Sequence, residues 1–233
     1  FEKAVPSKVS ASWGHANGLN IAGWDKRHDE EYVTMVLATI ISGAGATPKQ
    51  DGWHAVGPEC CFGALTSGDI ELLEYSYPII IHKYGLMEDS GGAGEFRGGS
   101  GTAWEVEPLD SEMTFIMFGE GRRIPAVGAA GASSAMVESK VGRLERKIGG
   151  KVEVIKDNII GTIKPGETVT NKNPGGGGFG HPFKRPVEKV VWDVKNGLVS
   201  VKGAKQDYGV VIKDTKSLAV DMAATTKLRA AAH

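Results

Sequence analysis

The 233-residue sequence is poor in cysteine, with only two, the adjacent Cys60 and Cys61. Neighbouring cysteines rarely bridge each other, and two thiols alone do not make a zinc-binding pattern. The sequence therefore gives no sign of a disulfide or of a zinc–thiolate site. We interpret both residues as buried thiols of a protein in the reducing cytoplasm.

The sequence also lacks long apolar runs and a surplus of charge. No apolar run reaches the roughly 18 residues of a membrane span. The formal net charge is -1, so no general attraction to nucleic acid or to an anionic membrane is expected. We therefore predict neither kind of partner. The hydrophobic content of 41% and charged content of 24% are ordinary for a soluble globular protein.

Several familiar catalytic spacings are missing. The six histidines show no His-x-x-x-His or His-Glu-x-x-His spacing, and no Gly-x-Ser-x-Gly motif occurs. We therefore predict no metal site built wholly within this chain. The sequence opens at Phe1 in what reads as the end of a helix, and we interpret the chain as a fragment or processed piece of a longer subunit.

Glycine, by contrast, is abundant, with 33 residues. The densest run lies in residues 173–182 and includes the candidate anion-binding residues Gly176, Gly177 and Gly178. Glycine loses the most entropy on ordering, so a fold keeps such a run where the backbone approaches something closely or turns through positive φ. A helix is predicted directly afterwards, at residues 185–194. A glycine loop leading into a helix N-terminus favours anion binding, and the alternative is a hinge or a packing turn.

The order of the predicted elements favours an α+β fold with many short strands and a few C-terminal helices. We predict one unit, residues 1–233, with a possible sub-boundary near residues 165–185. Turn signals place hairpins around residues 149–150 and 164–166. Further strands are predicted at residues 32–41, 102–107 and 113–118, the last two as a pair.

Two arginines in glycine-rich turns are candidates for binding a substrate or an anion. Arg97 could clamp a carboxylate or phosphate bidentately, or it could pair with Asp89 and hold its own loop. Arg122, close to Glu120, allows the same two interpretations.

Three further residues are catalytic candidates. His181 ends the glycine run, although a loop histidine often bonds only to backbone. Glu71 and Glu74 lie three apart and would share one face of a helix. Carboxylate pairs perform acid–base chemistry, whereas exposed glutamates are usually only solvated.

The glycine segments resemble those of a known family. Residues 89–101 read Asp-Ser-Gly-Gly-Ala-Gly-Glu-Phe-Arg-Gly-Gly-Ser-Gly and, with residues 173–180, resemble two hallmark segments of the hydantoinase B/oxoprolinase family. Residues 187–209 resemble its closing helix–strand segment, and Asp51-Gly52 also fits. The family includes hydantoinase and 5-oxoprolinase subunits and the large subunits of acetone and acetophenone carboxylases.

The resemblance implies ATP-dependent activation of an amide or enolate oxygen of a small-molecule substrate. It implies ATP and a divalent metal bound outside this chain, in a hetero-oligomer. The partners would be a hydantoinase A-like subunit and the missing N-terminal half of this subunit. We further predict that main-chain amides of the two glycine segments line a shared cavity, which polypeptide outside this chain completes.

The resemblance also bears on the reaction. Residues 183–194 and 119–126 favour the ketone carboxylases, which form a C–C bond with bicarbonate through a phosphorylated enolate. The alternative is an ATP-dependent hydantoinase or 5-oxoprolinase that cleaves a cyclic amide, with this chain as a non-catalytic structural part.

Overall fold

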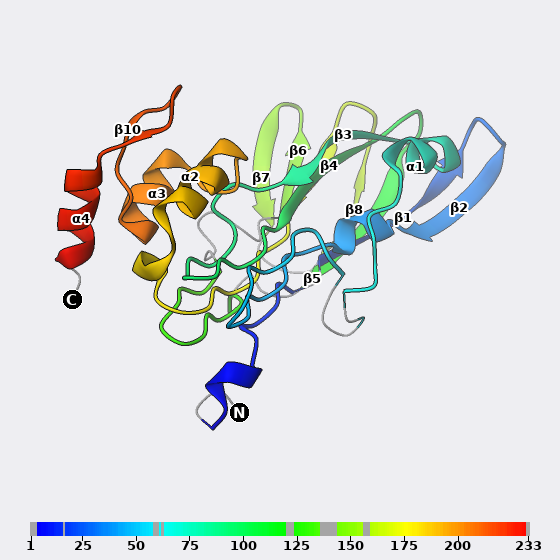
Figure 1. The fold of residues 1–233 in the computed structure, drawn as a ribbon. Helices are drawn as coiled ribbons and strands as arrows, with labels where there is room; N and C mark the ends of the chain where they lie inside the picture. Colours follow the sequence, from blue (N-terminus) through cyan, green and yellow to red (C-terminus); the bar gives the residue numbers. More distant parts are fainter. Residues whose placement is uncertain are drawn as a thin grey trace.

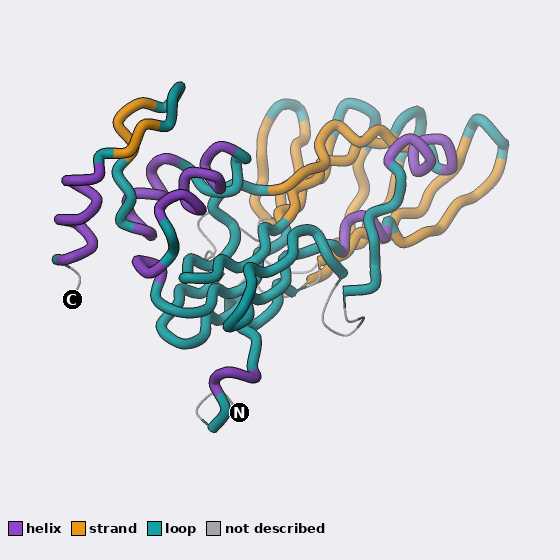
Figure 2. Tube along the Cα trace, in the orientation of Figure 1, coloured by secondary structure: helices purple, strands orange, loops and turns teal. Residues whose placement is uncertain are grey.

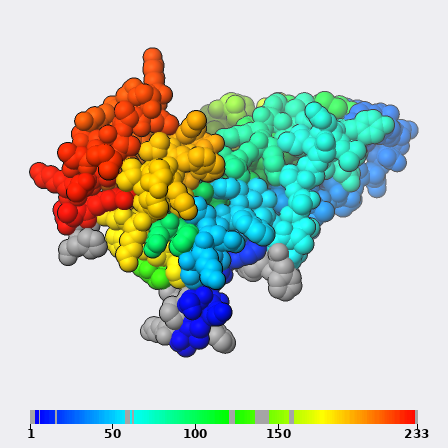
Figure 3. Space-filling view, viewed as in Figure 1, coloured from blue at the N-terminus to red at the C-terminus, as the bar shows by residue number. Residues whose placement is uncertain are grey.

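The computed structural model describes residues 4–15, 17–57, 61, 63–119, 124–135, 144–155 and 159–231. The described residues form three antiparallel sheets and four α-helices, three of the helices near the C-terminus (Figure 1). The predicted α+β class is confirmed. The C-terminal elements form one end of the molecule and the β1–β2 hairpin the other (Figure 3). No described helix has the length and apolarity that a membrane crossing requires.

Two of the sheets are large. The four-stranded sheet has the order β2-β1-β5-β8, with β1 Asn17–Asp25, β2 Glu30–Met35, β5 Met113–Gly119 and β8 Ile159–Ile163. The five-stranded sheet has the order β3-β4-β9-β6-β7, with β3 Ile79–Leu86, β4 Thr102–Pro108, β6 Leu144–Ile148, β7 Lys151–Ile155 and β9 Thr168–Lys172. The third sheet pairs β10 Ile212–Asp214 with β11 Ala219–Val220.

The main core lies between the two large sheets. Side chains alternate between the faces of a strand, so Met113, Phe115 and Met117 of β5 are fully buried while Ile116 faces outward. They belong to the same cluster as Trp104 of β4. Burial of one face from each sheet is therefore what holds the two sheets together.

Some predicted pairings are wrong. The strands predicted at 102–107 and 113–118 exist as β4 and β5, but β4 pairs with β3 and β9, while β5 pairs with β1 and β8. Likewise β8 and β9 flank the 164–166 turn, yet they belong to different sheets. At both turns the chain crosses from one sheet to the other, because each sheet must bury its own apolar face. The hairpin at residues 149–150 is confirmed as β6–β7.

The strand predicted at residues 32–41 is only partly confirmed. β2 ends at Met35, and a short 3₁₀ helix, η2 Leu37–Ile40, follows. Thr39 stabilises this turn, since its hydroxyl donates to the Val36 carbonyl at 2.6 Å and accepts from the Leu19 N–H at 3.1 Å. Local hydrogen bonds to a threonine thus override the β-branched composition.

The helices follow the local sequence signals closely. They are α1 Ile70–Ser76, α2 Val187–Lys195, α3 Val201–Tyr208 and α4 Met222–Ala230. The Ser200 hydroxyl caps α3 by accepting from the Gly203 N–H at 2.8 Å. Gly209 closes α3 in the left-handed region with φ of 64°. Val190 of α2 packs with Ala204 and Tyr208 of α3 in a second, smaller core.

Between the sheets and the helices lies a stack of extended segments with almost no regular secondary structure, drawn as side-by-side teal tubes in Figure 2. We call it the glycine bundle, and its segments are residues 11–15, 42–46, 51–54, 90–101, 126–135 and 173–180. Backbone hydrogen bonds connect each segment to several others. For example, Gly176 N–H donates to Gly99 O at 2.9 Å, and Gly99 N–H donates to Ala44 O at 2.9 Å.

The bundle explains why glycine is needed. A Cβ atom added to Gly176 would come within 3.0 Å of the Ala44 carbonyl, and one added to Gly99 would come that close to the Trp53 carbonyl. Collagen uses the same principle, since only glycine fits where several backbones crowd together. Gly176, Gly177 and Gly178 therefore serve close approach between backbones, and none of the three has a positive φ.

Candidate functional site

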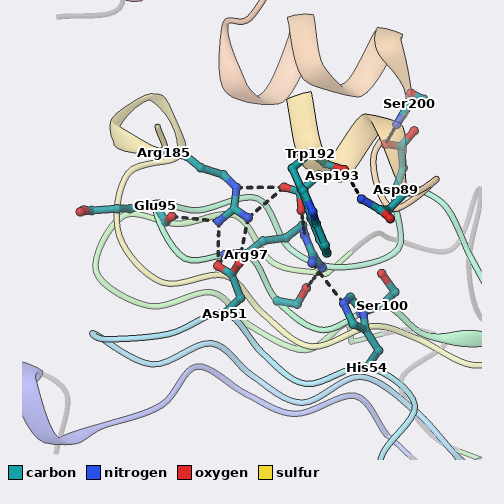
Figure 4. A network of polar contacts seen from close by, with 12 residues as sticks. Asp51, His54, Asp89, Glu95, Arg97, Ser100, Arg185, Trp192, Asp193 and Ser200 are labelled. Carbon is teal, nitrogen blue, oxygen red and sulfur yellow. Dashed lines mark hydrogen bonds and ion pairs between the residues drawn. The ribbon is translucent and has the colours of Figure 1, made fainter. Parts of the chain in front are cut away.

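A buried group of charged side chains lies where the glycine bundle meets α2 (Figure 4). We call it the Arg–Asp cluster, and it consists of Asp51, His54, Arg97, Arg185 and Asp193. The five residues come from three separate parts of the sequence. The cluster therefore exists only in the folded chain.

Arg185 lies between the two carboxylates, as Figure 4 shows. It donates from Nη1 and Nη2 to the two oxygens of Asp51, at 2.7 and 2.8 Å, and from Nε to Asp193 Oδ2 at 2.9 Å. Its side chain is 1% exposed. Local structure fixes this position, because Arg185 is the C-cap of the short helix η4 Pro182–Lys184, and only Pro186 separates it from α2, which carries Asp193.

Arg97 completes the pairing around Asp193. Its Nε donates to Asp193 Oδ1 at 3.3 Å, its Nη1 to the Gly98 carbonyl at 2.6 Å, and its backbone N–H to Asp51 Oδ1 at 2.7 Å. The predicted alternative, a pairing of Arg97 with Asp89, is wrong. Asp89 instead accepts from the Ser200 N–H at 2.8 Å at the start of α3, so it holds a helix rather than its own loop.

Burial and charge act in opposite directions on the carboxylates. Burial favours the neutral form of Asp51, but the hydrogen bonds and charge of Arg185 outweigh it, so the pKa of Asp51 lies below its ordinary value. Burial raises the pKa of Asp193, against the opposing charges of Arg97 and Arg185. Asp51, whose side chain is 30% exposed, is the outer member of the pair.

His54 forms the outer edge of the cluster beside Arg97. The Ser100 N–H donates to its Nδ1 at 2.9 Å, and its Nε2 lies 3.3 Å from Arg97 Nη2. Burial, followed by the charge of Arg97, lowers the pKa of His54 to about 4. His54 is therefore a neutral imidazole at neutral pH. Sequence spacing gave no signal for it beyond the neighbouring Asp51-Gly52.

The predicted anion-binding glycines lie beside Arg97 but are already hydrogen-bonded. The N–H groups of Gly176, Gly177 and Gly178 donate to the carbonyls of Gly99, Ser12 and Ser133. An anion could use these amides only after those hydrogen bonds had broken, and their role as site residues stays a prediction. The two glycine segments do lie together, with Gly92 N–H donating to Gly176 O at 2.8 Å, and the cavity that they would line with polypeptide outside this chain stays a prediction.

The other predicted site residues are dispersed. His181 accepts from the Phe183 N–H at 3.2 Å as the N-cap of η4, which matches the backbone role considered for it. Glu71 and Glu74 do lie on a helix, α1, but α1 packs beside β3, far from the Arg–Asp cluster (Figure 1). Glu74 accepts there from the Ile81 N–H at 2.7 Å. Arg122 lies outside the described residues.

Metal ligands are not gathered in the part of the chain that the structure describes. No three or more histidine, cysteine, aspartate or glutamate side chains lie together there as a metal site would require. The Arg–Asp cluster itself is unsuited to a metal ion, because both of its carboxylates already bind guanidinium groups.

The chain is similar to characterised proteins over its whole length. Caprolactamase subunit beta of Pseudomonas jessenii is 60% identical over 233 residues, which are 99% of this chain and 40% of that protein. The crystal structure of the ATP-dependent caprolactamase from Pseudomonas jessenii superimposes with a TM-score of 0.87 and 53% identity, covering 98% of this chain and 40% of that one. The acetophenone carboxylase delta subunit of Aromatoleum aromaticum is 26% identical, over 100% of this chain and 38% of its own length.

The chain thus spans about two fifths of the length of these relatives. The model of the hydantoinase B/oxoprolinase family matches residues 1–182, which include the Asp51 and Arg97 half of the cluster and the glycine bundle. This chain belongs to the hydantoinase B/oxoprolinase family.

Proposed function

We propose that the chain is part of the B-type subunit of an ATP-dependent enzyme that hydrolyses a cyclic amide, of the lactam or hydantoin class. The observation that carries this proposal is the 60% identity to a caprolactamase subunit across 99% of the chain. Identity to the acetophenone carboxylase subunit is 26%. The sequence-based preference for a ketone carboxylase is therefore replaced by its alternative.

We assign ATP binding to polypeptide outside this chain. A nucleotide site needs free N–H groups or a lysine around the phosphates, and the amides of Gly176, Gly177 and Gly178 are hydrogen-bonded within the bundle. The described residues therefore do not fit ATP at the glycine run. A hydantoinase A-like partner would supply the nucleotide, and the rest of this subunit would hold any divalent metal.

Within such an enzyme, this chain would contribute a rigid wall beside the substrate. The Arg–Asp cluster joins the bundle to α2 through four ionic side chains, so the Arg97 donors are held in place before a ligand binds. Preorganised donors are the groups that stabilise a developing charge on an oxygen. We place the assembled hetero-oligomer in the cytoplasm.

The test is an assay of the complete subunit co-expressed with its A-type partner. We expect ADP release that depends on a cyclic amide, with caprolactam, hydantoin and 5-oxoproline compared side by side. The product would be the ring-opened amino acid, or the N-carbamoyl amino acid from hydantoin. Reactions without ATP and without the partner serve as controls. Turnover only with acetone or acetophenone and bicarbonate would overturn the proposal in favour of a carboxylase.

A further inference from the structure

The orientation of His54 is fixed by a backbone donor. The Ser100 N–H points at His54 Nδ1 at 2.9 Å, and a backbone amide can only donate. Nδ1 must therefore carry the lone pair, and the proton of the neutral imidazole lies on Nε2. Rotating the ring by 180° would place a carbon atom against the Ser100 N–H and lose this bond.

Arg97 has one nitrogen with no acceptor among the described residues. Nε donates to Asp193 and Nη1 donates to the Gly98 carbonyl, whereas the hydrogen-bond neighbour of Nη2 is His54 Nε2, at 3.3 Å. A guanidinium has no acceptor atom. The N–H groups of Arg97 Nη2 and His54 Nε2 therefore face each other, and the Arg97 side chain is 2% exposed.

An unpaired buried donor carries a free-energy cost that an acceptor would remove. Neither nearby carboxylate accepts from Arg97 Nη2, because Asp51 and Asp193 accept from Arg185 and from other N–H groups of Arg97. An oxygen atom about 2.9 Å from both nitrogens would lie at hydrogen-bond distance from each of them. The two donors thus define the position of a missing acceptor.

Two further observations support a ligand at this place. Ser100, fully buried and drawn beside His54 in Figure 4, has an Oγ with no hydrogen-bond partner in the described part of the chain. His54 itself is half-buried, and the preceding Trp53 is 63% exposed, so the His54 side of the cluster reaches the surface.

We propose that His54 Nε2–H and an Arg97 Nη2–H together bind one oxygen atom, either the carbonyl oxygen of a cyclic amide or a carboxylate oxygen of the opened product. The identity of this ligand rests on the proposed function. The donor pair itself rests on the hydrogen bonds of Ser100, Gly98 and Asp193. In this role His54 and Arg97 position the oxygen, and Asp193 holds Arg97.

Two substitutions of His54 separate binding from folding. His54→Asn keeps an acceptor near the Nδ1 position for the Ser100 N–H but removes the Nε2 donor. His54→Gln keeps a donor near the Nε2 position but removes the acceptor. His82→Asn is the matched control, since His82 is an exposed histidine paired with Glu107 on the five-stranded sheet.

The experiment measures binding of caprolactam, 6-aminohexanoate and acetate to the assembled enzyme by calorimetry, together with the melting temperature of each variant. Caprolactam tests the carbonyl oxygen, and the two carboxylates test the product. We expect His54→Asn to lower the affinity for at least one of these probes about tenfold, because one hydrogen bond to the ligand is lost. The melting temperature of this variant should stay near that of the wild type. We expect His54→Gln to bind more tightly than His54→Asn in spite of lower stability.

Unchanged affinity of His54→Asn for all three probes would overturn the site. A loss of affinity in both variants that simply follows their melting temperatures would also overturn it, since that pattern marks a structural histidine. The outcome is independent of the proposed function: acetate binding that depends on His54 supports the site even in an enzyme that opens no lactam. Lactam hydrolysis by His54→Asn together with wild-type affinity for all three probes would retain the proposed function and reject the site.

Discussion

At the scale of single residues, Arg185 shows how a buried charge can become indispensable. Its guanidinium satisfies Asp51 bidentately and Asp193 through Nε, and its own carbonyl accepts from Arg229 Nη2 at 2.9 Å. A buried ion pair contributes little relative to an apolar replacement of the whole group, but removing one partner leaves an uncompensated buried charge.

We therefore predict that Arg185→Met lowers the free energy of unfolding by about 3–5 kcal/mol. The matched control is Arg146→Met, because Arg146 makes an ion pair with Glu153, whose side chain is 60% exposed, and such surface pairs contribute about 1 kcal/mol or less. Urea denaturation of both variants checks the prediction. Equal losses of unfolding free energy in the two variants would show that burial of the Arg–Asp cluster does not increase the contribution of its ion pairs to stability.

The low pKa of His54 predicts a stability that depends on pH. The folded state holds His54 neutral down to about pH 4, whereas the unfolded chain protonates it near its ordinary pKa of 6.5. Between these values the unfolded state binds more protons, so stability falls as the pH falls, by up to about 1.4 kcal/mol per pH unit. Asp51, whose folded pKa is lowered, adds to the loss at more acidic pH.

The measurement is the urea midpoint at pH 7 and at pH 4.5, for wild type and for His54→Asn. We expect a clear drop in the wild type and a smaller one in the variant, which has no imidazole to protonate. Identical pH dependence in the two proteins would contradict the assignment of this effect to His54.

At the scale of elements, the helices were predictable because their signals are local. Ser200 and Gly209 cap α3 from positions adjacent to it, and the β6–β7 turn is formed by Gly149 and Gly150 with φ of 53° and 78°. The partners of β4, β5, β8 and β9 were not predictable in the same way. Which strands pair depends on where two sheets bury their faces, and no residue at the turns specifies that.

The glycine bundle is the element for which a substitution decides between two interpretations. Gly176→Ala would place a Cβ against the Ala44 carbonyl, whereas a Cβ at Gly85 of β3 would meet nothing within 4 Å. We predict that Gly176→Ala destabilises the protein by about 3 kcal/mol or more, because backbone cannot move aside as a side chain does. Gly85→Ala should be neutral or stabilise by about 0.5 kcal/mol.

Thermal unfolding of the two variants makes this comparison, and both substitutions add the same single methyl group. A mild effect of Gly176→Ala, similar to that of Gly85→Ala, would mean that the run is a plain hinge. The same result would remove the reason for calling the bundle a packed element.

At the scale of the whole molecule, the bundle joins the core between the sheets to the helical core of α2 and α3. Segments from the beginning, middle and end of the chain donate hydrogen bonds to one another there. Opening one segment therefore disrupts several others, so the bundle should open only with the fold as a whole.

We predict slow hydrogen exchange for the amides of Gly99, Gly176 and Gly177, comparable to that of β4 and β5 in the main core. Hydrogen exchange followed by mass spectrometry on the native protein measures this. Exchange within seconds, as in an ordinary surface loop, would contradict the prediction and show that the bundle opens locally.

The helix caps, the α+β order of elements, the glycine segments and, through these segments, the family can all be read from the amino-acid sequence alone. These features depend on residues a few positions apart, or on a backbone that tolerates no side chain. Three other features depend on the packing of the complete chain: Arg97 pairs with Asp193 rather than Asp89, the glycine N–H groups donate to carbonyls of neighbouring segments, and His54 faces Arg97. The physical reason is that buried charges and unpaired donors take whichever partners the complete packing brings within hydrogen-bond distance, and Arg97 and Asp193, for example, lie 96 positions apart in the chain.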